Sequence, residues 1–218
     1  MALLVTSVAA ATGRAPRALG WAVAVLYAEW MVVAMSYGKV DHDRFAYLVA
    51  LFALATAGPA RHGDATPTER GGWAMRVTQV GAIATYFLAF ATKYRYGGFD
   101  WLNSSTLTWA VVRRGTPFGH WVMDIPGALV AMQWFIVFFE MLSPVVFFVS
   151  ERARRRIVGL LYLFHVGTYA ALKIAFFPHL IALAAFLPIE KVRPVVWVRR
   201  RLPARSGSDT RPAASVSA

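Results

Sequence analysis

Five long apolar segments run along the chain and are separated by short stretches that carry its charges. They cover residues 21–38, 45–60, 73–93, 125–150 and 157–188. A helix needs roughly 20 apolar residues to cross the hydrocarbon core of a bilayer, and about 17 at the least. The first four segments therefore predict one spanning helix each. Segment 45–60 is short, so we expect it to pack tightly against its neighbours or to tilt little.

The last segment, 157–188, is too long for one helix and too short for two full spans. Phe177 and Pro178 interrupt it, and proline breaks a helix because it has no amide hydrogen and clashes with the preceding turn. We expect a helix, a break and a short second helix. The predicted fold is all-α, a polytopic transmembrane helical bundle with five spans plus a short re-entrant or sixth helix.

Three segments flank or interrupt this bundle. Residues 1–20 have no basic region before their apolar residues, which predicts an interfacial helix or a disordered lead rather than a signal peptide. Residues 95–115 are aromatic and amphipathic, as is typical of a segment in the membrane interface. Residues 191–218, after the transmembrane domain 21–190, are basic and then rich in Ser, Pro and Ala, so we expect a largely disordered tail.

Composition supports a membrane protein and excludes other classes. Of the 218 residues, 58% are hydrophobic and 16% are charged, whereas about a quarter of a soluble domain is charged. The net charge of +12 lies in short clusters between apolar segments, so it indicates membrane topology and no nucleic-acid partner. The chain has no cysteine, which excludes disulfides, thiolate metal sites and thiol nucleophiles.

The basic residues between the spans predict the orientation, because cytoplasmic loops are enriched in Lys and Arg. With the N-terminus inside, nine basic residues lie on the inner side and six on the outer side. If the last segment is a hairpin, the seven basic residues of the tail raise the inner total to sixteen. We therefore expect a multi-pass protein of a bacterial inner membrane, with the N-terminus and the tail in the cytoplasm.

Ionisable side chains within the predicted spans are costly in lipid and usually face the interior of the bundle. Glu29, Glu140 and His165 each lie about 13–16 Å from an inner boundary, at about 1.5 Å per helical residue. We expect the three to meet near the midplane, with Glu140 and His165 as a structural ion pair, a proton relay or a clamp for a ligand. Lys93 ends the third span, and His42 falls in a loop, where a solvated histidine is the usual state.

Helical spacing groups further polar side chains on shared faces. Tyr86 and Lys93 are seven residues apart, and His165 and Tyr169 are four apart, so each pair lies on one face of its helix. Two interpretations stay open. These side chains either hydrogen-bond neighbouring helices to one another or line a pocket for a ligand.

Metal and haem sites receive little support. His165 and His179 are fourteen residues apart, a spacing by which one helix presents ligands to two haems, but Pro178 intervenes. Glu29, Glu140 and His165 are acceptable metal ligands by type, yet no close-spaced ligand motif is present. The sequence predicts no metal site.

Three stretches of the sequence resemble a known family. They are YFLAFATK at 86–93 followed by Trp101, FEMLSP at 139–144 followed by an arginine cluster and His165, and FPHL at 177–180. In order and spacing these stretches resemble the horizontally transferred transmembrane (HTTM) domain family, which includes the membrane part of vitamin K-dependent gamma-carboxylases. The resemblance covers about residues 21–188 and implies a helical membrane domain.

The resemblance also implies a role for Lys93, because a lysine at this place in the carboxylases deprotonates vitamin K hydroquinone. Burial and the neighbouring Arg95 would help a lysine to act as a base, whereas a lysine that only extends to the interface is the alternative. The expected cofactor is a quinone or another isoprenoid lipid. The expected catalytic residues are Lys93, Glu140 and His165, and the expected cofactor-binding residues are Tyr86, Arg95, Trp101 and Tyr169.

The sequence departs from the carboxylase pattern at three positions. Phe90 stands in place of a glycine, Thr92 in place of a second lysine and Phe45 in place of a histidine. The 218 residues also contain no large extramembrane domain that could grip a protein substrate. We therefore do not expect this chain by itself to carboxylate protein glutamates.

Two functions of different classes follow. The first is an intramembrane pocket, accessible to lipid or quinone, with redox or carboxylase-like chemistry. The second is a non-enzymatic membrane subunit that packs against other membrane proteins. Membrane lipid and a membrane protein that supplies a soluble domain are the expected partners. A transporter is disfavoured because no inverted repeat is evident.

Overall fold

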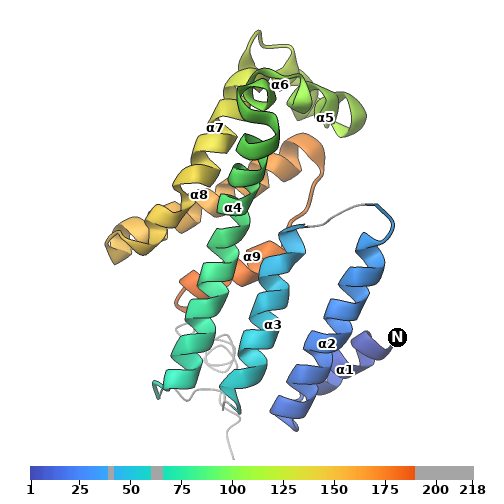
Figure 1. The fold of residues 1–218 in the computed structure, drawn as a ribbon, viewed down its shortest axis with the longest axis vertical. Helices are drawn as coiled ribbons and strands as arrows, with labels where there is room; N and C mark the ends of the chain where they lie inside the picture. Colours follow the sequence, from blue (N-terminus) through green and yellow to red (C-terminus); the bar gives the residue numbers. More distant parts are fainter. Residues whose placement is uncertain (39–41, 60–65, 190–218) are drawn as a thin grey trace, which may run out of the picture. The chain divides into compact units, whose positions relative to one another are not determined.

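The computed structural model describes residues 1–38, 42–59 and 66–189 of the chain, and these ranges contain helices and no strand. The predicted all-α class is confirmed. In chain order (Figure 1) the elements are α1 (Ala2–Ala11), α2 (Pro16–Met35), the 3₁₀ turn η1 (His42–Arg44), α3 (Phe45–Ala57), α4 (Glu69–Asn103), α5 (Thr106–Arg114), α6 (Pro117–Met123), α7 (Ala128–Leu142), η2 (Ser143–Phe147), α8 (Glu151–Leu172), α9 (Phe177–Leu183) and η3 (Ala184–Phe186).

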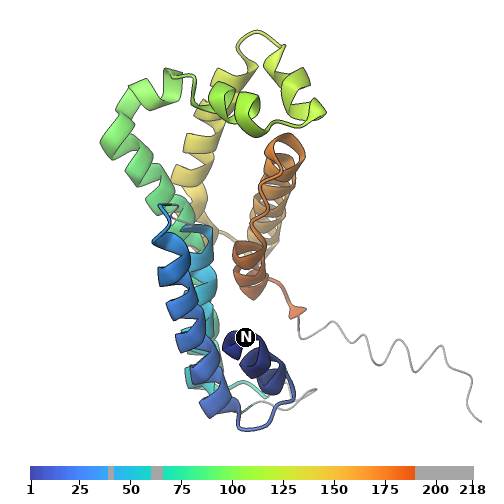
Figure 2. The same cartoon turned by 90° about the vertical axis from the view of Figure 1, so that its right-hand side faces the viewer.

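Helix α4 is the central element and contacts α3, α7 and α9. Figures 1 and 2 both show α3 running alongside it. The main buried cluster joins four helices, with Ala46 from α3, Tyr86 from α4, Leu161 from α8 and Leu183 from α9. Residues far apart in the sequence therefore meet around the middle of α4.

Helix α3 packs closely on α4 because small residues line the contact. Ala46, Ala50 and Ala53 of α3 are buried, and so is Gly81 of α4. A Cβ atom added at Gly81 would lie 3.1 Å from Cγ1 of Val49, so the backbones approach each other closely there. Small residues permit such approaches between membrane helices. The tight packing predicted for this short helix is confirmed.

Three helical segments are long and apolar enough to cross a membrane, among the residues that the structure describes: Pro16–Met35, Glu69–Asn103 and Ala128–Phe147. Helix α3 has 13 residues, which is about 20 Å against a hydrocarbon core of about 30 Å. Helix α8 is 22 residues long, but arginines fill its first turns. Three spans are therefore supported, and the count of five spans plus one stays a prediction.

Residues 95–115, predicted as an amphipathic interfacial segment, are largely helical. Helix α4 continues to Asn103 through a kink at Gly98, whose φ of 50° and ψ of −140° are non-helical. Glycine adopts such angles without a steric penalty, because it has no Cβ atom. Helix α5 follows and is amphipathic, with Val111 buried and Arg113 and Arg114 in its last turn. Its place in the interface stays a prediction.

The predicted break in the last apolar segment is confirmed. Helix α8 ends before Lys173, which has a left-handed φ of 55°, and α9 begins at Phe177 with Pro178 in its first turn. Proline is favourable there because the first amides of a helix need no partner within it. The chain thus breaks four residues earlier than the proline alone indicates.

The ends of the chain differ in how far they are described. Residues 1–20, predicted as an interfacial helix or a disordered lead, form α1 and the beginning of α2. The predicted tail 191–218 lies outside the described residues, and so do Lys39 and Arg61 of the charge count. The predicted sides of the N-terminus and of the tail stay predictions.

We expect Gly81→Leu to destabilise the protein by about 1–3 kcal/mol, because the added side chain has no room against α3. Gly72→Leu, on the same helix, is the matched control, since nothing lies within 4 Å of a Cβ atom added there. Both variants replace a glycine of α4 by leucine, so both gain helix propensity. Thermal unfolding of the detergent-solubilised protein measures the difference, and equal stability of the two variants would contradict the close α3–α4 contact.

Candidate functional site

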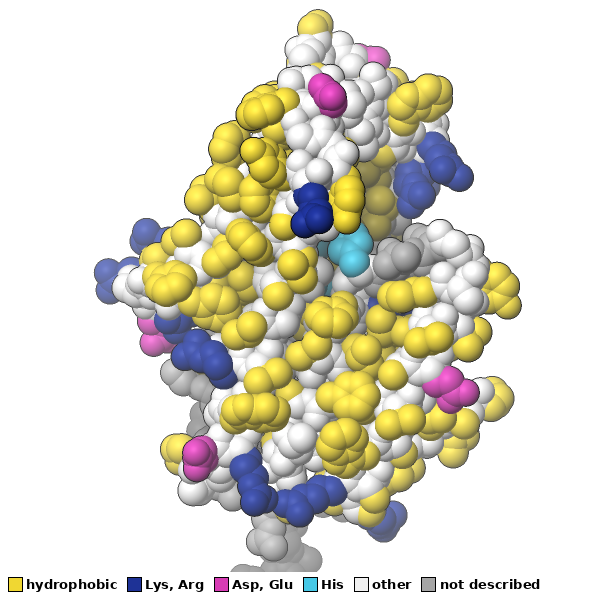
Figure 3. Space-filling model, viewed as in Figure 1, with side chains coloured by type: hydrophobic (Ala, Val, Ile, Leu, Met, Phe, Trp, Pro, Cys, Tyr) yellow, Lys and Arg dark blue, Asp and Glu magenta, His cyan; other side chains and the backbone are white. Residues whose placement is uncertain are grey.

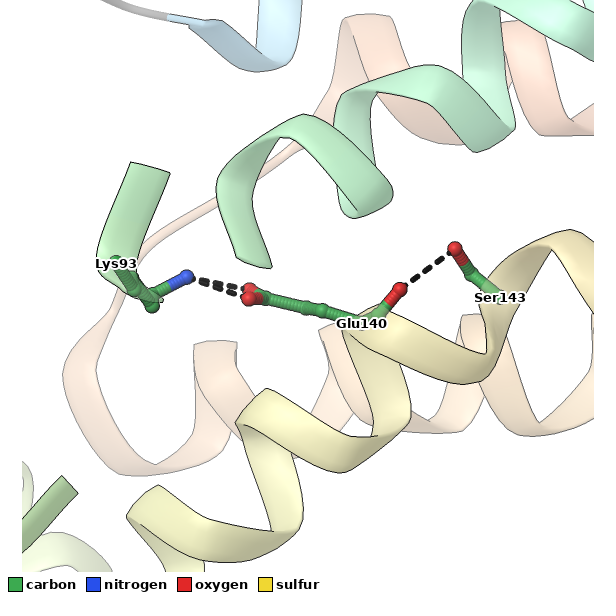
Figure 4. A network of polar contacts seen from close by, with 3 residues as sticks. All are labelled: Lys93, Glu140 and Ser143. Carbon is green, nitrogen blue, oxygen red and sulfur yellow. Dashed lines mark hydrogen bonds and ion pairs between the residues drawn. The ribbon is translucent and has the colours of Figure 1, made fainter. Parts of the chain in front are cut away.

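An ion pair between Lys93 and Glu140 joins α4 to α7. The Lys93 ammonium donates to both carboxylate oxygens, at 2.7 Å to Oε1 and 2.6 Å to Oε2 (Figure 4). The side chains of Lys93 and Glu140 are only 22% and 9% exposed. Because charges are costly in lipid unless they are paired, each side chain requires the other.

Neighbouring groups hold the two charges in place. The Ser143 hydroxyl donates to the backbone carbonyl of Glu140 at 2.8 Å, where α7 passes into η2. The Lys93 nitrogen also lies 5.4 Å from the centre of the Trp101 ring, which the kink at Gly98 separates from the straight part of α4. An aromatic face attracts a cation at such a distance. The expected cofactor-binding residue Trp101 thus lies beside Lys93 in the structure.

A cavity of about 500 Å³ lies next to Lys93. Its lining is His42 and Phe45 from η1 and α3, and Thr85, Leu88, Ala89, Thr92 and Lys93 from α4. Figure 3 shows that hydrophobic side chains cover most of the visible face, with a histidine and a basic side chain among them. Apolar walls with a few polar groups are typical of ligand pockets.

His42 was not predicted as a site residue, because a solvated histidine is the usual state in a loop. The structure places it on the cavity that Lys93 also lines, although the side chain is exposed. A signal for this position was available. His42 precedes the second apolar segment and Lys93 ends the third, so two antiparallel helices bring both residues to the same end.

A second polar cluster joins Tyr86, His165 and His179 on α4, α8 and α9. The Tyr86 hydroxyl and His165 Nε2 are 2.6 Å apart, and the Tyr86 and His179 rings lie edge to face with centres 4.8 Å apart. The two histidine rings are 5.3 Å apart. The break between α8 and α9 thus brings together two histidines that a single helix would hold at separate levels.

The predicted pairing of Glu140 with His165 is replaced by two other pairs, Lys93–Glu140 and Tyr86–His165. Glu140 and His165 are both buried, so their predicted placement inside the bundle is right. Glu29 does not join them, because it is exposed on α2, a helix that packs mainly against α1 and α3. The level of a residue along a helix follows from counting, but its rotation toward a neighbour does not.

Two of the expected cofactor-binding residues lie apart from this arrangement. Arg95 is exposed, with its guanidinium 5.8 Å from the Tyr96 ring, and Tyr169 is 55% exposed on α8. Tyr86 is buried beside His165 and Trp101 lies beside Lys93. Among the four, Tyr86 and Trp101 are therefore the two that the structure joins to the predicted catalytic residues.

The described residues contain no group of three or more His, Asp or Glu side chains arranged to hold a metal ion. His165 Nδ1 and both ring nitrogens of His179 are buried without a hydrogen-bond partner in this part of the chain. A neutral imidazole always carries one N–H donor, so such burial is unfavourable. The cluster stands as a buried polar contact between three helices.

The apolar helices and their buried charged pair define this protein as a helical membrane protein with a polar site inside its bundle. The HTTM domain model matches residues 59–191, more than half of the chain, and the protein therefore belongs to the HTTM domain family. The match includes Lys93, Glu140 and His165. No curated protein and no solved structure matches the chain.

We expect Lys93→Met and Glu140→Leu each to destabilise the protein, because each leaves one charge without its partner. The loss is up to about 3–5 kcal/mol for a fully buried pair, and the partial exposure of Lys93 lowers it. The double variant removes both charges and should recover most of the loss. Thermal unfolding in detergent gives the coupling, and additive losses would contradict a direct interaction.

Proposed function

We propose that this HTTM-family protein is a membrane enzyme that acts on a quinone or another isoprenoid lipid in the cavity beside Lys93. One observation carries the proposal. The Lys93 ammonium is paired with Glu140, and the same residue lines the cavity. An ammonium has three donors, and Glu140 accepts from it at two oxygens, which leaves one donor for a ligand.

The cavity suits a flat ring with an apolar tail. Phe45, Leu88 and Ala89 supply apolar walls, while Lys93 and His42 supply polar groups. The volume of about 500 Å³ is within the range of pockets for small ligands, about 300–1,000 Å³. Lys93 and His42 are the side chains that would hold the oxygens of a quinone ring. When bound, a reduced quinone supplies an acidic hydroxyl and two electrons.

When the Lys93–Glu140 pair takes up a proton from a ligand, the pair becomes cationic and the ligand anionic, so the membrane gains no net charge. Together the two groups share one exchangeable proton, held either on Lys93 Nζ or on a Glu140 oxygen across 2.6–2.7 Å. A second proton leaves Glu140 neutral and Lys93 cationic beside the cavity. That cation then balances the negative charge on the group that lost the proton, so Lys93 acts as the base and Glu140 as its proton acceptor.

A non-enzymatic subunit is the competing function, and the completeness of the ion pair favours it. Lys93 and Glu140 satisfy each other's charge without a ligand, as side chains do that only hold two membrane helices together. In this case the protein acts by packing against a membrane protein that carries a soluble domain. Redox or carboxylase-like chemistry and a multi-pass location in a bacterial inner membrane belong to the first proposal.

We expect the gently purified wild-type protein to retain about one quinone or isoprenoid molecule per chain, measured by mass spectrometry of its lipid extract. Lys93→Ala should lose it, because the ligand loses its charged partner. Leu88→Trp should lose it as well, because the larger side chain fills the cavity. Lys93→Ala also breaks the ion pair, so Leu88→Trp tests the cavity with the pair intact.

Val80→Trp is the matched control, since Val80 is 50% exposed on the same helix and Leu88 is 56% exposed, but only Leu88 lines the cavity. Only bulk phospholipid in the wild-type extract, unchanged by Leu88→Trp, would overturn the proposal. The subunit function would then be the better explanation of the ion pair.

A further inference from the structure

A second apolar groove lies between α7, η2 and α8, away from the residues that line the Lys93 cavity. It encloses about 600 Å³. Its lining is almost entirely aromatic and aliphatic: Phe135, Phe138, Phe139, Leu142, Ser143, Val145, Ile157, Leu160 and Leu161. The one hydroxyl among them, from Ser143, already donates to the Glu140 carbonyl. The groove therefore offers contacts to hydrocarbon and few to polar groups.

Arginines lie at the α8 end of this groove. Residues of a helix are separated by about 100° around its axis, and Ile157, Leu160 and Leu161 define the side of α8 that faces the groove. Arg154 and Arg156 lie one turn earlier and flank that side. Arg155 lies on nearly the opposite side of the helix and serves below as a reference position.

Arg154 is held in position beside the groove. Its Nε donates to the backbone carbonyl of Val146 at 3.3 Å, next to the lining residue Val145, and the side chain is half-buried. A guanidinium has five N–H donors. The other N–H groups of Arg154 form no hydrogen bond with the described residues, so they are available to an acceptor from outside the protein.

The positive charge around Arg154 favours the binding of an anion. Four arginines, at 152 and 154–156, lie within five residues, and Glu151 pairs with Arg155. Arg156 is exposed and forms no ion pair within the described ranges. Like charges four residues apart, such as Arg152 and Arg156, repel each other on a helix. An acidic group bound at this end of the groove would relieve the repulsion.

We propose that this groove binds an anionic phospholipid, with an acyl chain along α7 and α8 and its phosphate group on Arg154 and Arg156. The cluster of arginines favours a head group with a net negative charge, and arginine binds its phosphate in a bidentate manner. The apolar lining selects the tail. In the predicted orientation this end of α8 faces the cytoplasmic leaflet, which is the leaflet with the negative surface potential.

The test uses the full chain, stripped of lipid in detergent and titrated with phosphatidylglycerol or phosphatidylcholine of identical acyl chains. Native mass spectrometry measures the affinity for each lipid. We expect the wild type to prefer phosphatidylglycerol. Arg156→Gln should lower the affinity for phosphatidylglycerol about fivefold, the effect of one basic residue near a membrane surface, and Arg156→Lys should restore most of it.

Two matched controls separate the groove from the general surface. Arg155→Gln removes the same charge from the far side of α8, where Arg155 pairs with the exposed Glu151, and should change the affinity little. Leu160→Trp should weaken binding because the larger side chain fills the groove. Leu163→Trp should not, because Leu163 does not line the groove, and it is a matched control because the two leucines are similarly exposed, at 53% and 62%. Equal affinity for the two lipids would overturn the proposal, and so would equal effects of each variant and its control. Either result would mean that lipid binds the surface of the helices without a specific site.

Discussion

The ion pair of Lys93 and Glu140 is the interaction on which the site depends. Both groups lie on helices that are long and apolar enough to cross a membrane, so neither charge is tolerable without the other. Because the two side chains must lie side by side, the pair determines how α4 is positioned along α7. The Ser143 hydroxyl donates a hydrogen bond to the backbone of Glu140, and the Trp101 ring lies beside the Lys93 ammonium. Contacts within the protein therefore set the position of the Lys93 side chain beside the cavity.

The rest of α4 supports that arrangement on two further sides. Two turns before Lys93, Tyr86 contacts His165 and His179. Through these contacts α8 and α9 pack against α4. Gly81 lets α3 approach closely on another side. Phe45, at the beginning of α3, thus comes to the same cavity as Lys93. One central helix therefore carries the charge, the polar cluster and the close packing.

The sequence predicted features that depend on local composition. The short helix predicted in segment 45–60, the break near Pro178 and the buried state of Glu140 and His165 all follow from segment length, from proline and from the cost of charge in lipid. It did not predict which charges pair, because depth in a membrane follows from counting residues, whereas rotation depends on neighbouring helices. For the same reason His42 was not predicted to line the cavity, and Glu29 and Tyr169, which are exposed, were predicted to face the interior.

The most direct test exchanges the two charges. In the double variant Lys93→Glu with Glu140→Lys the ion pair can form again, but the ammonium moves from α4 to α7, away from the residues that line the cavity. We expect the double variant to be more stable than either single variant and to copurify with no quinone or isoprenoid. If the double variant retained the wild-type amount of that lipid, the position of Lys93 would be irrelevant to binding, and the pair would serve only to join two helices.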